Sequence, residues 1–320
     1  VYRDNLNIIN KITVLRLFNL FKLYRSFLVS RISKIGAIHG LPAALSIEPT
    51  TTCNLGCPEC PSGLRQFTRK TGNLKSELNT KIINEISTSL LYINYYFQGE
   101  PFINRNLFEL IKEASKKNIY TSTSTNAHYL TPKNAVKTVE SGLDRLIISV
   151  DGTTQETYEA YRKGGSLSKV IQGTKNLINA KRDLKSKTPH IIFQFLVVRQ
   201  NEHQIESAIK LSKNLSVDEI RFKTAQLYDY KNGNPLMPTI EKYSRYKKSK
   251  NGNYVLKNKL FNHCWRMWSS SVVTVDGKLV PCCFDKDAKY KIGDLSKKSF
   301  EEIWRSKTYK RLRKGIISNR

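Results

Sequence analysis

Three cysteines lie close together in the run Cys53-Asn54-Leu55-Gly56-Cys57-Pro58-Glu59-Cys60. The spacing C-x3-C-x2-C puts three thiolates on one short loop, where each can bind a different iron of a cubane cluster. The fourth iron then lacks a protein ligand, and an open coordination position is what separates catalytic from structural metal sites. An incomplete zinc site is the alternative, but structural zinc normally has four nearby ligands and His39 is poorly placed. The spacing therefore favours an iron–sulfur cluster.

A second cysteine group consists of Cys264, Cys282 and Cys283. Disulfides form in oxidising compartments, yet no secretory signal opens the sequence, so two clustered groups favour metal binding in a reducing cytoplasm. The first residue is Val1 rather than Met, which is consistent with a fragment of a longer chain.

The chain is strongly basic, because 54 Lys and Arg against 26 Asp and Glu give a formal net charge of +28. Such a charge suggests a polyanionic partner, either nucleic acid or a membrane surface. The basic residues are scattered and form no dense block, which favours compositional drift toward Lys. A nucleic-acid groove needs aromatics interleaved with Lys and Arg, and only residues 243–250 offer them. We therefore do not expect a nucleic-acid partner.

The chain has 320 residues, enough for one large domain with an appendage or for two domains. Its sequence alternates strand and helix patterns, and these elements must position the cysteines. Such alternation predicts a parallel sheet with right-handed crossovers, which gathers functional groups at the carboxyl ends of its strands. Gly99-Glu100-Pro101, Asn126 and Asp151 all follow strands, so we expect them to share one site with the cysteine loop. Strands are predicted at residues 45–47, 92–97, 120–125, 146–150, 191–198 and 219–222. Helices are predicted at residues 82–91, 107–117, 132–141, 170–184 and 205–215.

The two ends of the chain have a different character. Residues 13–35 are predicted to form a basic amphipathic helix, with too many charges for a membrane span of about 20 apolar residues. It suits either a position on the outside of the catalytic domain or a membrane interface. Residues 228–262 are polar and Lys-rich, as in a linker or lid. A β-hairpin is predicted at residues 271–280 and a final basic helix at residues 300–313.

The cysteine run and Gly99-Glu100-Pro101 after the second strand resemble the radical S-adenosylmethionine (SAM) enzymes. The resemblance covers residues 45–223 and implies an α/β fold, the partial (β/α)6 barrel of that family. It also implies a [4Fe–4S] cluster on Cys53, Cys57 and Cys60, with SAM chelating the fourth iron. One-electron reduction, by a partner such as flavodoxin or ferredoxin, then yields a 5′-deoxyadenosyl radical that abstracts hydrogen from the substrate.

The same resemblance implies a SAM-binding role for several strand-end residues. Gly99, Glu100 and Pro101 match the family's Gly-Gly-Glu-Pro turn, which binds the methionine amino group, with Gln98 in place of the first glycine. Ser124 and Asn126 match positions near the ribose and the carboxylate. Serine and asparagine are also common turn formers, which is the plainer explanation.

The segment Ser149-Val150-Asp151-Gly152 with Tyr158 and Arg162 resembles the SPASM-type peptide modifiers, where a serine and an arginine contact SAM. Arg162 would offer a fixed fork for a carboxylate, unless it forms a salt bridge on a solvent face. Asp151 is either a general base or the cap of the following turn. One residue departs from the family: Glu59 stands where an aromatic usually lies against adenine.

The C-terminal spacing Cys264-x12-Gly277-x4-Cys282 resembles the first half of the SPASM auxiliary-cluster pattern. The second half is absent, although Cys283 is an adjacent extra thiol. We expect a truncated auxiliary-cluster segment; a three-cysteine cluster with one open iron and an empty vestigial site are the alternatives. The division that follows is an N-terminal helix at 1–40, the barrel at 41–227, a linker at 228–262 and a SPASM/twitch-like segment at 263–320.

The resulting hypothesis is a radical SAM enzyme that acts on a peptide or protein side chain. A small molecule, a carbohydrate or a nucleic acid is the alternative substrate within the same class. A non-catalytic iron–sulfur protein is the alternative from another class. We expect a cytoplasmic protein, with peripheral membrane contact through residues 13–35 as a further option.

Overall fold

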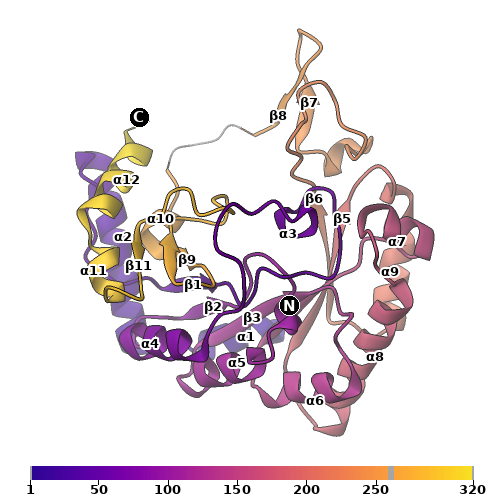
Figure 1. The fold of residues 1–320 in the computed structure, drawn as a ribbon, viewed down its shortest axis with the longest axis horizontal. Helices are drawn as coiled ribbons and strands as arrows, with labels where there is room; N and C mark the ends of the chain where they lie inside the picture. The colour runs from indigo at the N-terminus through magenta and orange to yellow at the C-terminus, as the bar shows by residue number, and fades with distance from the viewer. Residues whose placement is uncertain (1, 259–262, 319–320) are drawn as a thin grey trace.

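One open sheet organises the chain. The computed structural model describes residues 2–258 and 263–318, where nine strands pair in the order β11-β10-β9-β1-β2-β3-β4-β5-β6 (Figure 1). From β1 to β6 each strand runs parallel to the next, which confirms the predicted parallel α/β sheet. The six strands are β1 Ala44–Ile47, β2 Tyr92–Asn94, β3 Tyr120–Thr125, β4 Arg145–Ser149, β5 His190–Val197 and β6 Glu219–Thr224.

Helices cover the outer face of the parallel strands, as right-handed crossovers require (Figure 1). The helix predicted at 82–91 is wrong in its bounds, because α4 spans Ser76–Ile86 and residues 87–91 turn toward β2. The others begin and end within three residues of their predicted bounds. The remaining barrel helices are α3 Pro61–Leu64, η1 Pro101–Ile103, α5 Leu107–Lys116, α6 Pro132–Glu140, α7 Gln155–Tyr161, α8 Leu167–Asp183, η2 Glu202–Gln204 and α9 Ile205–Asn214.

The central strand β3 is polar although it is buried along its whole length. Buried hydroxyls need hydrogen-bond partners, and Thr123 Oγ1 donates to the Tyr95 carbonyl at 2.7 Å. Thr121 lies within 3.2 Å of the Asp144 carboxylate. The carboxyl end of β3 carries Ser124 and Thr125. This buried polar strand thus ends at the edge where functional groups gather.

The C-terminal segment extends the barrel sheet rather than forming a separate unit. β9 Ser270–Val273 pairs parallel to β1, and β10 Lys278–Val280 pairs antiparallel to β9, which confirms the predicted hairpin. β11 Gly293–Asp294 is the last strand. The single final helix predicted at 300–313 is wrong: Ser306 caps a new helix, so α11 Phe300–Trp304 and α12 Lys307–Ile317 are separate.

Residues 228–262 contain more structure than a plain linker. Within the described part of this segment, η3 Glu241–Tyr243 precedes an antiparallel hairpin of β7 Tyr246–Lys248 and β8 Tyr254–Leu256. The hairpin projects from the carboxyl end of the barrel (Figure 1). Residues 259–262 of the predicted linker lie outside the described residues.

The N-terminal helices are α1 Tyr2–Asn10 and α2 Val14–Ser33. α2 packs on the C-terminal segment: the Phe27 ring lies 5.4 Å from that of Trp265, just before α10 Arg266–Ser269, and 5.3 Å from that of Trp268 within α10. The buried Arg16 guanidinium donates to the carbonyls of Asn118 and Lys117, which anchors the start of α2 to the barrel. None of the helices in the described residues has the length and apolar content to cross a membrane.

Candidate functional site

The cysteine loop follows β1 and lies across the carboxyl ends of the strands. All three of its cysteines line one small cavity of about 50 Å³. The middle of the loop is fixed, because the Gly56 amide donates to the Lys163 carbonyl at 2.9 Å. A Cβ at Gly63 would lie 2.6 Å from the Cys57 nitrogen, so glycine lets α3 pack directly on the loop.

Gly99 and Glu100 close the cavity from the end of β2. Gly99 has a φ of +72°, and a Cβ there would lie 2.4 Å from the Thr50 carbonyl oxygen, so only glycine fits. The buried Glu100 carboxylate accepts from Thr125 Oγ1 and from the Asn126 amide, both at 2.7 Å. Burial raises the pKa of Glu100 to about 7. This carboxylate therefore joins two strand ends and titrates near neutral pH.

Asn126 connects the end of β3 to the cysteine loop. Its side-chain amide donates to Asn54 Oδ1 at 2.8 Å, and its own Oδ1 accepts from the His128 amide at 3.1 Å. Ser124, two residues earlier, lines the same cavity. Sequence reasoning missed Asn54, because it occupies a variable position between the first two cysteines of the motif.

Arg162 reaches the cavity from the end of α7. Its Nη1 lies 3.8 Å from Cys57 Sγ, and its Nε lies 2.5 Å from Asp151 Oδ2. The second Asp151 oxygen accepts from the Leu196 amide at 2.7 Å, and Asp151 is fully buried. The arginine is therefore held by a buried carboxylate and faces a thiol, not the solvent. Both oxygens of Asp151 are engaged, which favours a role in positioning Arg162.

Most of the predicted barrel residues meet at this cavity. Pro101 and Asp151 do not line it: Pro101 is the first residue of η1 and Asp151 lies behind Arg162. Tyr96 and Thr125 line it although no motif marks them, and their only signal is a position at or just beyond a strand end. The predicted residues that line the cavity are Cys53, Cys57, Cys60, Gly99, Glu100, Ser124, Asn126, Ser149 and Arg162.

The thiols lie in a largely buried environment. Burial raises the pKa of Cys53 to about 11 and also raises the pKa of Cys57, where the Arg162 charge opposes the shift. Among the described residues no three His, Cys, Asp or Glu side chains converge closely enough to bind a single metal ion. A cubane does not need such convergence, because each soft thiolate binds a different iron. The donor set therefore fits a cluster.

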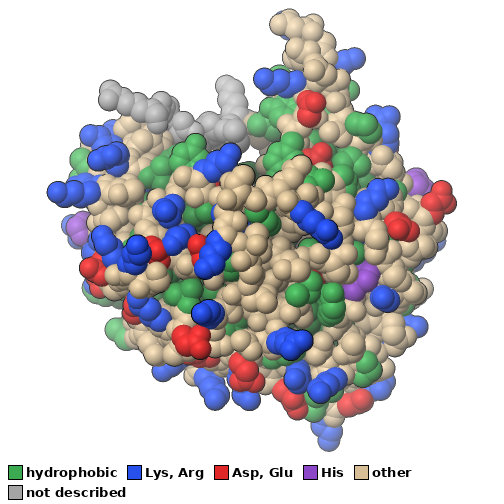
Figure 2. Space-filling model, in the orientation of Figure 1, with side chains coloured by type: hydrophobic (Ala, Val, Ile, Leu, Met, Phe, Trp, Pro, Cys, Tyr) green, Lys and Arg blue, Asp and Glu red, His purple; other side chains and the backbone are tan. Residues whose placement is uncertain are grey.

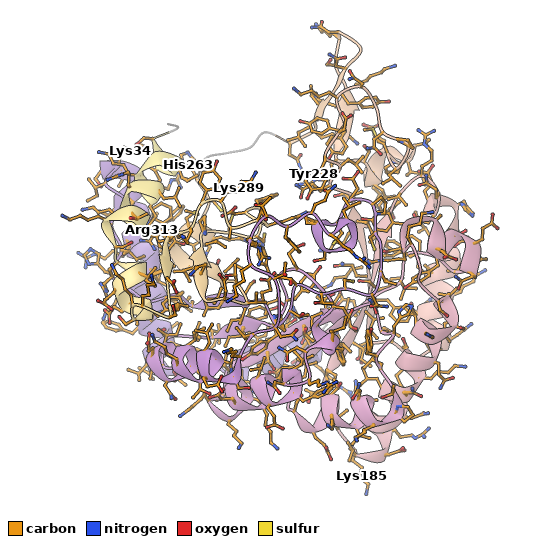
Figure 3. The ribbon with its side chains drawn as sticks, in the orientation of Figure 1. Lys34, Lys185, Tyr228, His263, Lys289 and Arg313 are labelled. Atoms are coloured by element: carbon orange, nitrogen blue, oxygen red, sulfur yellow. The ribbon has the colours of Figure 1, made fainter. Side chains whose placement is uncertain are left out.

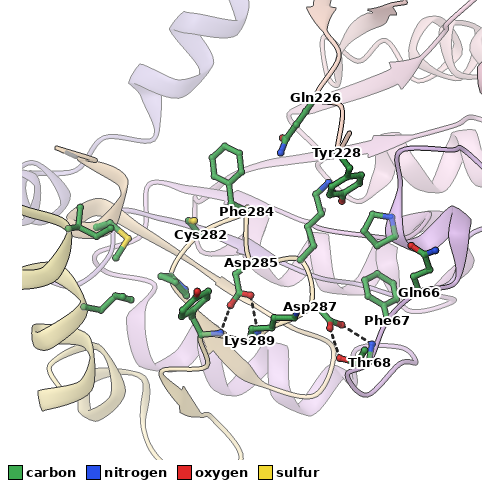
Figure 4. Close-up of a pocket in the computed structure, with 17 residues that line it drawn as sticks. Gln66, Phe67, Thr68, Gln226, Tyr228, Cys282, Phe284, Asp285, Asp287 and Lys289 are labelled. Atoms are coloured by element: carbon green, nitrogen blue, oxygen red, sulfur yellow. Dashed lines mark hydrogen bonds between the residues drawn. The ribbon is translucent and has the colours of Figure 1, made fainter. Parts of the chain in front are cut away.

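Of the C-terminal cysteines, Cys282 lies at a different, larger pocket of about 800 Å³ (Figure 4). Cys282 lines this pocket; burial raises its pKa, and the neighbouring thiols Cys283 and Cys264 add to the rise. Cys264 and Cys283 are exposed. One side of the pocket is tied to the segment after α3, because Asp287 accepts from the Thr68 amide at 2.9 Å.

Comparison with protein families identifies this arrangement. The model of the radical SAM superfamily matches residues 47–212, which is more than half of the chain. The chain belongs to the radical SAM superfamily. The SPASM model, an iron–sulfur cluster-binding domain, matches residues 264–320. Both resemblances that the sequence suggested are thereby confirmed, and the cofactors of such a radical SAM protein are a [4Fe–4S] cluster and SAM, with an auxiliary iron–sulfur cluster in the SPASM domain.

Curated relatives of this radical SAM protein include two PqqA peptide cyclases. The protein from Bradyrhizobium diazoefficiens is 28% identical over 207 residues, which cover 63% of this chain and 52% of that protein. The protein from Rhodopseudomonas palustris is 25% identical over 215 residues, covering 67% of this chain and 55% of that protein. The chain thus spans about half the length of these relatives.

Solved structures share the fold at low identity. SuiB from Streptococcus suis bound to S-adenosylmethionine has a TM-score of 0.65 at 15% identity and covers 89% of this chain and 70% of that one. Native anSMEcpe with bound AdoMet has a TM-score of 0.60 at 19% identity, covering 84% and 82%. BtrN in complex with AdoMet and 2-DOIA has a TM-score of 0.51 at 16% identity, covering 87% and 88%.

The residues of the cavity fit the family's cofactors in their chemistry. Three thiols suit the cluster, while a carboxylate and a guanidinium suit a ligand that carries both an amino group and a carboxylate. The volume of about 50 Å³ is well below the roughly 300–1,000 Å³ of small-molecule sites. The cavity is therefore smaller than a complete SAM site.

Proposed function

We propose that this protein is a radical SAM enzyme whose cluster is bound by Cys53, Cys57 and Cys60. The observation that carries the proposal is the convergence of the cysteine loop with the ends of β2, β3 and β4 at one cavity. The proposed division of the chain is a helix region at 1–40, the barrel at 41–227, a linker at 228–262 and a SPASM/twitch-like segment at 263–320. The residues proposed to bind SAM are Gly99, Glu100, Pro101, Ser124, Asn126, Ser149 and Arg162.

When bound, the cluster and SAM supply reductive cleavage of a carbon–sulfur bond to a 5′-deoxyadenosyl radical, which abstracts hydrogen from the substrate. The side chains of this protein bind SAM and orient it. Glu100 presents a buried acceptor for an amino group, and Arg162 presents a fork for a carboxylate. We propose that Asp151 holds Arg162 in place, a positioning role instead of the general base considered from sequence. Burial of these groups keeps water away from the reacting atoms.

We propose that Cys264, Cys282 and Cys283 bind the auxiliary cluster beside the larger pocket. The rim of this pocket carries the aromatic side chains of Tyr228 and Phe284 (Figure 4). Its volume of about 800 Å³ falls within the range of roughly 300–1,000 Å³ for small-molecule sites, which also suits an inserted peptide side chain.

A peptide or protein side chain is the substrate class that we propose. Two relatives are named as peptide cyclases, and SuiB has a structure bound to the precursor peptide SuiA. The fold of the barrel alone does not determine the substrate class, because BtrN shares the fold and is bound to 2-DOIA instead of a peptide. The pocket with an aromatic rim, between the cysteine loop and the SPASM segment, supports the proposal of a peptide substrate.

The proposed enzyme needs a one-electron donor such as flavodoxin or ferredoxin, which are acidic partners suited to a chain of net charge +28. Lys and Arg side chains are spread over the visible face of the molecule with Asp and Glu between them (Figure 2). A distributed positive field steers an anionic partner without a dense patch. The proposed location is the cytoplasm, with peripheral contact to a membrane.

The test is 5′-deoxyadenosine release from anaerobically reconstituted, dithionite-reduced protein. We expect release from the wild type and none from Cys57→Ala, whose iron content should fall by about one cluster. Secondary structure of the unreconstituted variant should match the wild type, which separates loss of the cluster from loss of the fold. Release that persists in Cys57→Ala would contradict the proposed cluster ligands. Iron binding without any 5′-deoxyadenosine from the wild type would favour the non-catalytic alternative.

A further inference from the structure

Exposed apolar side chains are concentrated at the N-terminal helices. Fourteen of the 23 large apolar side chains that are exposed in the described residues lie between positions 2 and 35, about a tenth of the chain. Scattered exposed apolar residues are normal on a protein surface, whereas a contiguous group marks an interaction site. The group spans α1 and α2, and nine of its fourteen members lie on α2.

The exposed apolar residues of α2 follow a helical period on the side opposite its packed face. The packed face contains Leu23, a member of the main hydrophobic cluster, and Phe27, which contacts Trp268 of the C-terminal segment. The second stripe faces solvent, and Val14 and Ile32 at its two ends are each 85% exposed. Spacings of three and four residues place its members on one side of the helix. These members are Val14, Leu17, Phe21, Tyr24, Leu28 and Ile32.

Basic side chains border this stripe, and acidic ones are missing from α2. The sequence of α2 contains no Asp or Glu, and Lys22, Arg25 and Arg31 are exposed along it. In residues 2–35 Asp4 is the one acidic residue, and it is buried against Arg145. The neighbouring α12 adds exposed cations, among them Lys310 and Lys314, whose backbone lies close to Gly36, three residues after the end of α2.

We propose that the exposed face of α1 and α2 binds the surface of an anionic phospholipid membrane. An apolar stripe bordered by Lys and Arg lies in the interface with its apolar side among the acyl chains and its cations at the headgroups. A second copy of this chain fits less well, because two molecules of net charge +28 repel one another. The inference is independent of the proposed chemistry, since it uses no residue of the SAM or cluster sites.

The experiment is flotation of the whole reconstituted protein with phosphatidylcholine vesicles, with and without phosphatidylglycerol. We expect binding to the anionic vesicles that weakens as salt rises. The double variant Phe21→Glu/Leu28→Glu should bind vesicles at least about tenfold more weakly. Two apolar side chains that insert among the acyl chains are lost, and two carboxylates that the anionic headgroups repel are gained. Both positions are exposed, Phe21 at 62% and Leu28 at 39%, so we expect the variant to keep the circular dichroism spectrum of the wild type.

A matched control is Leu184→Glu, which changes an exposed leucine on another side of the molecule. Leu184 is 44% exposed and is followed by Lys185, which lies far from Lys34 at the end of α2 (Figure 3). This variant should bind vesicles as the wild type does. Equal binding by Phe21→Glu/Leu28→Glu and the wild type, or a dimer in solution that this variant dissociates, would overturn the proposal. Without vesicles, the wild type and both variants should release the same amount of 5′-deoxyadenosine. Absence of release from all three would contradict the proposed chemistry and leave the membrane proposal unaffected.

Discussion

At the scale of single residues, Arg162 depends on Asp151 for its place at the cavity. The two side chains are 17% and 1% exposed, so this ion pair is largely shielded from water. Asp151→Asn leaves the guanidinium without its carboxylate, and breaking a buried pair by removing one partner costs about 3–5 kcal/mol. We expect a loss of about 3 kcal/mol in the free energy of unfolding, measured in urea without SAM.

The control for this prediction is Asp183→Asn. Asp183 pairs with Arg182, but both side chains are more than half exposed. An exposed pair contributes about 0–1 kcal/mol, so this variant should unfold as the wild type does. If Asp151→Asn loses no more stability than Asp183→Asn, the buried carboxylate does not hold Arg162.

Glu100 makes the stability of the protein depend on pH. Burial raises its pKa to about 7, above that of the unfolded chain, so the folded state binds the proton more tightly. The folded state therefore loses stability as pH rises from about 4.5 to about 7, by an amount on the order of 3 kcal/mol at the upper end. Below this window both states are protonated and the penalty disappears.

The Glu100→Gln variant removes this titration. We expect the difference in unfolding free energy between wild type and variant to change across the window from about pH 4.5 to about pH 7, and to stay flat outside it. Urea unfolding at a series of pH values, without SAM, measures the unfolding free energies of the wild type and of Glu100→Gln. The exposed Glu206→Gln is the matched control and should follow the wild-type profile. Parallel profiles for wild type and Glu100→Gln would mean that Glu100 does not titrate in this range.

At the scale of elements, the turn after β2 depends on glycine for two separate reasons. Gly99 and Gly252 both have positive φ, at +72° and +84°, but a Cβ at Gly252 meets no atom within 4 Å. Gly252→Ala should therefore lose only the conformational term of about 1–2 kcal/mol. Gly99→Ala adds a contact of 2.4 Å with the Thr50 carbonyl, and overpacking costs about 1–3 kcal/mol more. Thermal or urea unfolding compares the two, and equal losses would show that the contact with Thr50 is harmless.

The elements that could be predicted are those whose signal is local. The six parallel strands and most helices follow from apolar periodicity, and Cys53, Cys57 and Cys60 follow from their spacing. The pairing of β9 with β1 could not be predicted, because the partners are more than two hundred residues apart and no local pattern records the match. Asn54 and Tyr96 were missed for a similar reason: the cavity is defined by contacts between loops, not by one motif.

At the scale of the whole molecule, the barrel and the SPASM segment share one core. β9 adds to the edge of β1, and Leu45 and Ile47 of β1 belong to the same hydrophobic cluster as Trp268, Val273 and Trp304. The Arg313 guanidinium ties this region together, since it donates to the Met267 and Trp304 carbonyls. Removing the segment would expose an apolar strand edge, and exposed edges promote aggregation.

This shared core predicts a single cooperative unfolding transition. The three tryptophans of the chain, Trp265, Trp268 and Trp304, all lie in the C-terminal segment, so their fluorescence reports on that segment and on its contacts with α2 and β1. Far-UV circular dichroism reports mainly on the barrel helices. Because one core unfolds as a unit, the two signals should change at the same urea concentration. A tryptophan transition that precedes the loss of circular dichroism would show that the segment unfolds independently.

A chain ending at Asn258 tests the same coupling by removal. It lacks β9, which pairs with β1, and we expect it to aggregate or to unfold at a far lower temperature than the whole chain. The matched control is a short glycine–serine insertion after Gly252, in the turn of the projecting β7–β8 hairpin, where exposed residues tolerate insertion. A soluble truncated chain with the melting temperature of the whole protein would mean that the barrel folds without its C-terminal neighbour. Coincident loss of stability and of iron binding at the Cys53 loop would instead show that β9 maintains the β1 edge from which the cluster loop begins.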